Sequence, residues 1–109
     1  MTKTMLGKIY GCFFGLLDRQ IGLHLTFSCS DGSGMCDSLS MWDTSIKVTQ
    51  STMWTEEDRD RQYVSIVRRV SDVLMQAKKT DVSKLVGTPV ELTIEDNTLR
   101  SWRVLTEVI

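Results

Sequence analysis

The stretch Thr55-Glu-Glu-Asp-Arg59 marks the start of a helix, and this helix decides the fold. Thr is a favoured N-cap residue, and the acidic residues behind it complement the positive end of the helix dipole. Thr55 and Asp58 also have the spacing of a capping box, with Asp in place of the usual Glu or Gln. Apolar residues then recur every three or four positions: Tyr63, Ile66, Val67, Val70, Val73, Leu74 and Ala77. The pattern predicts an amphipathic helix over 56–79.

The predicted helix is about as long as the domain is wide. The chain has 109 residues, which is enough for one hydrophobic core, so we expect a single domain over 1–109. A helix over 56–79 is about 36 Å long at 1.5 Å per residue. A domain of this size has a diameter of about 34 Å. One helix therefore crosses the molecule, and a sheet must lie against it.

Two strands are predicted before the helix. Residues 6–14 and 21–29 carry strand patterns, and the second alternates apolar and polar side chains at period two. Residues 15–20 form a short connection, which favours a hairpin. A third, weaker strand is expected near Met41-Trp42 or at 46–48.

Two further strands are predicted after the helix. Residues 81–87 suggest a single helical turn that Gly87 stops. Residues 90–95 alternate strictly, Asp96-Asn97 supply a tight turn, and 99–105 return. The sequence thus predicts an α+β fold in the order β-β-(β)-α-β-β, with an antiparallel sheet of four to five strands packed on one long helix.

Composition narrows the classes of function. With 13 Lys and Arg against 14 Asp and Glu, the net charge of -1 gives no basic field for unspecific nucleic-acid binding. The N-terminal segment lacks the apolar run of a signal peptide, and no stretch approaches the roughly 20 apolar residues of a membrane span. We therefore expect a cytoplasmic protein with no membrane partner.

Metal binding is not favoured by the cysteines. The three cysteines, Cys12, Cys29 and Cys36, are an odd number and contain no CxxC pair. Together with His24 they could supply four zinc ligands, but structural zinc ligands normally come in close pairs. Free thiols in a reducing compartment are the better interpretation, and we expect neither a metal nor a cofactor.

Catalytic signals are weak. The acidic residues after Thr55 fan out around one helical turn, whereas a paired-carboxylate site needs converging side chains. Gly32-Ser-Gly34 lacks the GK[ST] that a phosphate-binding loop requires. His24 lies on the polar face of its strand, and no motif marks a Ser or Asp partner for it. We expect no enzyme and no catalytic residues.

Trp42 is the aromatic residue that best marks a functional surface. It stands in a polar run with no apolar partner in the pattern, and large aromatics often anchor interfaces. A polar stretch with two glycines, Ser30 to Ser38, precedes it and predicts a loop. A protein-binding surface that includes the 30–45 loop and Trp42 is therefore our first hypothesis.

A second set of residues suggests a small-molecule site. Asp18, Arg19 and Gln20 fall at the predicted hairpin turn. Together with Arg100 or Arg103, they are the polar groups that could receive the phosphate and base of a nucleotide. At strand period Arg100 shares a face with Trp102, and Arg103 opposes them.

Several stretches resemble a family of small proteins from tailed bacteriophages, most of them uncharacterised. The stretches are Trp54-Thr-Glu-Glu-Asp-Arg59, Leu85-Val-Gly-Thr-Pro-Val-Glu-Leu-Thr93 and Ser101-Trp-Arg-Val-Leu-Thr-Glu-Val-Ile109. Phe14-Gly-Leu-Leu-Asp-Arg-Gln-Ile-Gly-Leu23 is also similar, but the relatives have more Gly and Tyr where this chain has Leu16-Leu17. The resemblance implies a phage origin and the cytoplasm of an infected bacterium, and it implies no established activity.

Three functions remain open. The first is a non-enzymatic phage protein that binds and inhibits a host factor of anti-phage defence, and the second is a sponge for a signalling nucleotide. The third is a nucleic-acid-binding accessory protein that uses Arg68, Arg69, Lys78 and Lys79, although the net charge disfavours it. Since a small sheet leaves an edge or a face uncovered, we also expect a homo-oligomer.

Overall fold

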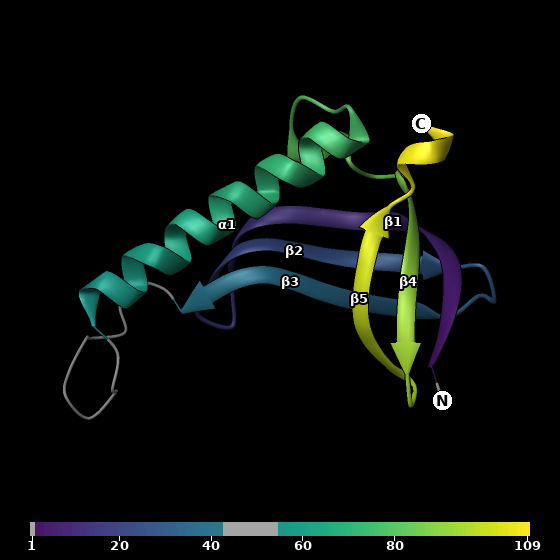
Figure 1. Cartoon of the computed structure of the whole chain (residues 1–109), viewed down its shortest axis with the longest axis horizontal. Coiled ribbons are helices and arrows are strands. Elements are labelled where there is room, and N and C mark those ends of the chain that lie inside the picture. The colour runs from purple at the N-terminus through teal and green to yellow at the C-terminus, as the bar shows by residue number, and fades with distance from the viewer. Residues whose placement is uncertain (1, 43–54) are drawn as a thin grey trace.

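The computed structural model describes residues 2–42 and 55–109, which form one antiparallel five-stranded sheet with a long helix beside it (Figure 1). The elements are β1 (Thr2–Leu17), β2 (Gln20–Cys29), β3 (Gly34–Trp42), α1 (Glu56–Ala77), η2 (Val82–Lys84), β4 (Pro89–Glu95), β5 (Thr98–Val104) and η3 (Thr106–Val108). The strand order is β3-β2-β1-β4-β5. The predicted α+β class, with the sheet packed on one helix, is confirmed.

Strand β1 is central and divides the sheet into two parts. Its residues 2–8 pair with β4, and its residues 7–17 pair with β2. A β-bulge between Ile9 and Gly11 lies where the partners change, and bulges bend the strand that carries them. Beyond the bulge, β1, β2 and β3 continue past β4 and β5 as a three-stranded arm, with β1 at its edge (Figure 1).

The strands before the helix are longer than the sequence predicts. β1 continues to Leu17, so its hairpin with β2 turns on two residues, Asp18 and Arg19, with φ of 50° and 65°. Positive φ at both central positions is the type I′ geometry that matches the twist of paired strands. The predicted loop from Ser30 to Ser38 is found only over 30–33, and its second part is wrong, because β3 already begins at Gly34. The third strand expected at Met41-Trp42 is confirmed, and 46–48 lie outside the described residues.

Helix α1 begins as predicted and ends slightly earlier. Asp58 N–H donates to Thr55 Oγ1 at 3.1 Å and Thr55 N–H donates to Asp58 Oδ2 at 3.1 Å, so the capping box is confirmed. The helix ends at Ala77, and Lys78 adopts the left-handed conformation. Within the described residues, no helix is both long enough and apolar enough to span a membrane.

The core lies between α1 and the concave face of the sheet. β2 contributes Leu23, Leu25 and Phe27, all buried, and α1 buries Ile66, Val73 and Ala77. Val67, expected on the core face, is largely exposed, so the apolar stripe that α1 buries is narrower than predicted. The radius of gyration is 15.3 Å against about 13 Å for a compact chain of this length, because the arm and the start of α1 extend outward.

One side-chain pair joins the two outer strands of the sheet. Trp102 of β5 donates its indole N–H to Asp37 Oδ2 of β3 at 2.7 Å, and its ring lies 5.1 Å from the ring of Phe27. β3 and β5 are the first and last strands of the sheet order. The sheet must therefore curl so that its opposite edges meet over the concave face.

We predict that Trp102→Phe lowers the free energy of unfolding by about 1–3 kcal/mol, because the half-buried Asp37 carboxylate loses its donor. Asp37→Leu in the same chain should recover part of this loss, since no charge then remains unpaired. Urea unfolding followed by circular dichroism measures both variants. If the double variant Trp102→Phe, Asp37→Leu is less stable than Trp102→Phe, the loss of stability comes from side-chain packing and not from the unpaired Asp37 carboxylate.

Candidate functional site

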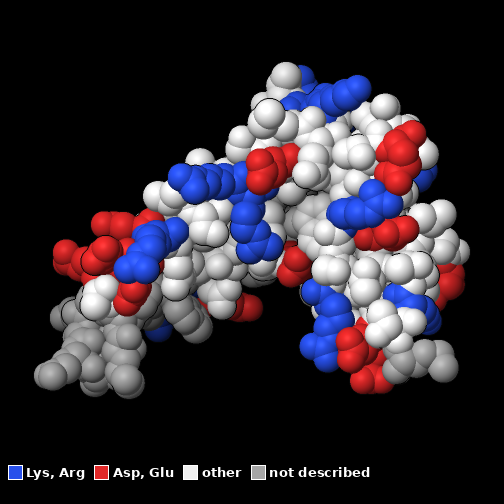
Figure 2. Space-filling view, in the orientation of Figure 1, with Lys and Arg blue, Asp and Glu red and all other residues white. Residues whose placement is uncertain are grey.

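A cleft of about 350 Å³ lies between α1 and β5, and Figure 2 shows the molecule hollowed there. Its polar walls are formed by Arg69, Asp72 and Gln76 of α1, Asp37 of β3, and Arg100, Ser101, Trp102 and Arg103 of β5. Leu39, Val73 and Val104 complete its lining. We call this the α1–β5 cleft. Its volume falls in the range of about 300–1,000 Å³ that small-molecule sites occupy.

Local structure explains why these side chains converge. Arg69, Asp72 and Gln76 are three and four residues apart, so they share one flank of α1. On β5 the register shifts between Thr93 and Ile94, which pair with Ser101 and Leu99, so Arg100 is the extra residue of a bulge. A bulge re-aims the side chain it carries. The simple alternation expected for β5 fails at this point.

The two arginines that line the cleft without a strong partner are Arg69 and Arg100. Arg100 Nε lies 3.6 Å from Glu95 Oε2, and both side chains are exposed, so this ion pair contributes little stability. Within residues 2–42 and 55–109, no ion pair engages Arg69. Both guanidinium groups can thus bind an anion without breaking a buried contact.

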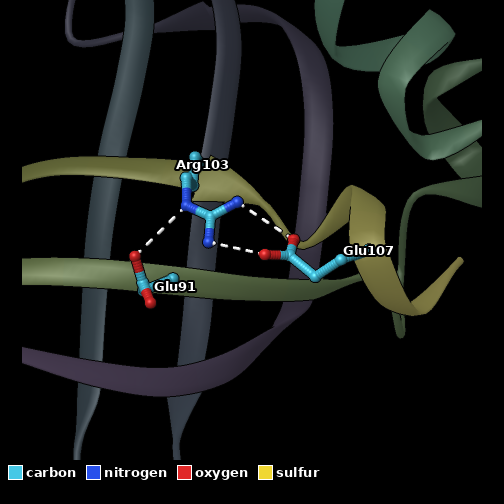
Figure 3. A network of polar contacts seen from close by, with 3 residues as sticks. All are labelled: Glu91, Arg103 and Glu107. Atoms are coloured by element: carbon cyan, nitrogen blue, oxygen red, sulfur yellow. Dashed lines mark hydrogen bonds and ion pairs between the residues drawn. The ribbon is translucent and has the colours of Figure 1, made fainter.

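Arg103 also lines the cleft, but two carboxylates hold it. Its Nη1 and Nη2 donate to Glu107 at 3.0 and 2.9 Å, and its Nε donates to Glu91 Oε1 at 3.2 Å (Figure 3). The hydrogen bonds to Glu107, and then the one to Glu91, raise the pKa of Arg103. The hydrogen bonds that Glu107 accepts from Arg103 lower the pKa of its carboxyl to about 2. Arg103 therefore ties η3 to β4 and β5.

The structure groups the other predicted site residues elsewhere. Asp18 and Arg19 form the exposed turn at the end of the arm, and Gln20 faces Trp42 in the β2–β3 register. Ser40 Oγ donates to Gln20 Oε1 at 2.8 Å, which engages that amide. β5, however, joins the sheet through β4 beside residues 2–8 of β1. The hairpin turn is therefore not brought together with Arg100 or Arg103.

The predicted surface around the 30–45 loop and Trp42 is also divided. The turn at 30–33 joins β2 to β3 at one end of these strands, and Trp42 is the last residue of β3 at the other end. The side chain of Trp42 and residues 43–45 lie outside the described part. Trp42 thus belongs with the tip of the arm, beside Gln20.

His24 is buried although it lies on the polar face of β2. The ring of Phe13 covers it at 5.0 Å, and Ser38 Oγ lies 2.8 Å from Nδ1. Nε2 lies 3.1 Å from the carbonyl oxygen of Gly15 and 3.2 Å from that of Gln20. Because carbonyls only accept, Nε2 carries a proton and donates. His24 therefore ties the arm hairpin together, and the sequence carries no motif that reveals its partner Ser38.

The cysteines lie apart in the fold. Cys12 Sγ donates to the carbonyl of Val82 at 2.9 Å, and partial burial raises the pKa of this thiol. Cys29 is buried and Cys36 is exposed, and all three thiols are free. Among the described residues, no group of His, Cys, Asp and Glu side chains is placed to hold a metal ion.

The edge of the arm carries an exposed apolar strand segment that sequence reasoning missed. Phe13, Phe14, Leu16 and Leu17 are all exposed, because beyond the bulge β1 has a partner strand on one side only. We call residues 13–17 the β1 edge. The signal in the sequence is the uncharged run from Ile9 to Leu17.

We predict that the Glu107 carboxyl titrates with a pKa of about 2, compared with about 4.5 in the unfolded chain. A lowered pKa means that the stabilisation by Glu107 is complete above pH 4.5 and is lost as the pH falls through 2. Carbon NMR of the glutamate carboxyls measures the midpoint, and Arg103→Gln should return it towards 4.5. An unchanged midpoint in that variant would contradict the contacts in Figure 3.

Comparisons with protein-family models, with curated proteins and with solved structures find no match to this chain. The resemblance to small proteins of tailed phages therefore stays a prediction from the sequence. The function has to be inferred from the cleft, the arm and their chemistry.

Proposed function

We propose that the protein is a non-enzymatic phage protein that sequesters a small host molecule of the nucleotide class in the α1–β5 cleft. The observation that carries this proposal is the presence of Arg69 and Arg100, both without a strong partner, beside Trp102 in one cleft. Removing a signalling nucleotide from the host cytoplasm would counteract anti-phage defence without any catalytic group.

The mixed charge of the cleft favours a nucleotide over a simple anion. Guanidinium groups bind phosphate through paired N–H donors. The carboxylates of Asp37 and Asp72 would repel a bare anion, but they accept hydrogen bonds from hydroxyl and amino groups. A ligand that carries phosphate, ribose and base offers both kinds of partner.

We expect a nucleotide from a panel of cyclic mono-, di- and trinucleotides to raise the thermal unfolding temperature. Ligand at 100 times its Kd should add about 2.7 kcal/mol to the free energy of unfolding. Arg69→Gln and Arg100→Gln should each weaken binding at least tenfold, measured by calorimetry. Arg68→Gln is the matched control, since Arg68 is an exposed neighbour on α1 outside the cleft.

Two results would reject the proposal that the α1–β5 cleft binds a nucleotide. The first is a panel in which no nucleotide stabilises the protein. The second is a ligand whose affinity falls as much with Arg68→Gln as with Arg69→Gln, because binding would then follow the general charge of α1.

The tip of the arm supports a second candidate function, the binding and inhibition of a host defence protein. The Asp18–Arg19 turn is exposed at the end of an arm that extends from the rest of the molecule (Figure 1). We expect a host protein retained by the wild-type chain to be lost with Arg19→Glu and kept with Arg68→Glu. Equal retention by both variants would contradict docking at the tip.

Nucleic-acid binding is the weakest of the three functions. On the face seen in Figure 2, basic and acidic patches alternate along α1, so the helix offers little continuous positive surface to a phosphate backbone. The proposal also includes a homo-oligomeric state, because the arm exposes an uncharged strand edge.

A further inference from the structure

The β1 edge lacks the features that normally keep strand edges apart. Natural edges carry charges, prolines or covering loops. Here the run from Ile9 to Leu17 has no charge and no proline. η2 contacts this edge at Cys12, where the thiol donates to Val82. Residues 13–17 beyond it remain open on that side within the described structure.

The β1 edge is apolar on both faces of the sheet. Phe14 and Leu16 pair with Leu23 and Ile21 of β2, on the concave face, and are 49% and 61% exposed. Phe13 and Leu17 pair with His24 and Gln20, on the other face, and each is 46% exposed. A partner on this edge would therefore have to supply apolar side chains to both faces.

The hairpin turn determines which main-chain N–H and C=O groups of β1 point towards β2 and which point towards the unpaired edge. A two-residue turn closes on a hydrogen-bonded pair, here Leu17 and Gln20, and such pairs alternate along antiparallel strands. Phe13, Gly15 and Leu17 therefore direct their N–H and C=O groups towards β2. Phe14 and Leu16 direct theirs towards the open edge.

We propose that this edge pairs with the same edge of a second copy of the chain, antiparallel, about a two-fold axis at Gly15. Phe14 then lies opposite Leu16 of the second copy, and Phe13 lies opposite its Leu17. Phe14 and Leu16 have their main-chain groups at the open edge in both copies, so four hydrogen bonds join the two strands. This inference deepens the homo-oligomeric part of the proposed function, and it does not depend on the ligand of the cleft.

The register follows from the residues that each axis would pair. An axis at Phe14 would set Leu17 opposite Gly11 and Phe13 opposite Gly15, so two large side chains would lack apolar partners. It would also need the main chain at Cys12, a residue whose thiol already contacts Val82 of η2. The axis at Gly15 pairs every large apolar side chain with another.

Gly15 itself fits this axis. A Cβ at Gly15 would meet only the ring of Phe13, at 3.6 Å, which is an ordinary contact, so the single chain has room for a side chain there. About the two-fold axis, the two glycines form a non-hydrogen-bonded pair, where Cα atoms approach to about 4.5 Å. The small residue thus stands where two copies come closest.

The area available is consistent with a small but specific dimer. At about 200 Å² for a large apolar side chain, the four exposed side chains offer roughly 400 Å² per chain and about 800 Å² per dimer. The main chain of the edge adds to this total. The side chains alone stay below the about 1,200 Å² at which standard interfaces begin, so we expect a small interface and a dimer whose population depends on concentration.

Measurement of the molecular mass in solution tests whether the β1 edge forms a dimer interface. Light scattering of the wild-type chain should give twice the mass of the 12.4 kDa chain, and Leu16→Lys should give the single mass with unchanged circular dichroism. Leu6→Lys is the matched control, since Leu6 is 56% exposed on the same strand but lies in the segment that pairs with β4, outside the β1 edge. A monomeric wild type, or an oligomer that Leu16→Lys leaves intact, overturns the proposal.

Cysteine cross-linking tests the register, in a Cys36→Ser background. Gly15→Cys should form a disulfide-linked dimer on oxidation, because paired Cα atoms at about 4.5 Å lie within disulfide range. Leu17→Cys should not, since four residues of strand, roughly 13 Å, separate it from Leu17 of the second copy. Cross-linking of Leu17→Cys alone would refute the register.

Nucleotide binding in the cleft and dimerisation at the β1 edge can be rejected independently of each other. The mass and cross-linking experiments use no nucleotide, so a monomer would leave the cleft proposal standing. A dimer that binds no nucleotide would reject the cleft and keep this interface. If a strand of a host protein binds the β1 edge instead, the chain forms a complex with that protein and Gly15→Cys gives no disulfide-linked dimer. That result would contradict the pairing of two copies of this chain.

Discussion

The hydrogen bond from Trp102 to Asp37 is the contact on which the shape of the molecule depends. It joins the first and last strands of the sheet order, so the sheet is held in a curl. The same two side chains line the α1–β5 cleft, together with the flank of α1 that carries Arg69. The interaction that closes the sheet therefore also forms two walls of the candidate site, and fold and site cannot be separated there.

The change of partners along β1 separates two candidate surfaces. Residues 2–8 of β1 pair with β4, and this part of the molecule carries the cleft. Beyond the bulge only β2 remains, and β1 becomes the edge of an arm that ends in the Asp18–Arg19 turn. The α1–β5 cleft and the exposed β1 edge thus occupy different parts of one small molecule.

The sequence predicted local structure well and spatial relations poorly. The capping box at Thr55 and the strict alternation of 90–95 depend on neighbouring residues, and both are found. The start of β3 was missed because Asp37 is a charged residue on the core side of that strand, which breaks the expected alternation of apolar and polar residues. Its position on the core side is explained by the hydrogen bond from Trp102, which the sequence does not reveal. The sequence could not show that Arg100 and Asp18 lie far apart, because their distance depends on the order of the strands in the sheet. It also could not show the open edge at 13–17, because this edge depends on where the pairing of β1 with β4 ends.

The pairing of β1 with β4 also has a consequence for how the chain folds. Thr2 pairs with Glu95 and Lys8 with Pro89, so the paired residues of these two strands are 81 to 93 positions apart along the chain. The arm hairpin can form early, since its strands are adjacent in sequence, but the first half of β1 stays unpaired until β4 joins it. Pairings of such long range slow folding. The sheet is therefore completed only after the arm hairpin has formed, and the first half of β1 stays exposed in the interval.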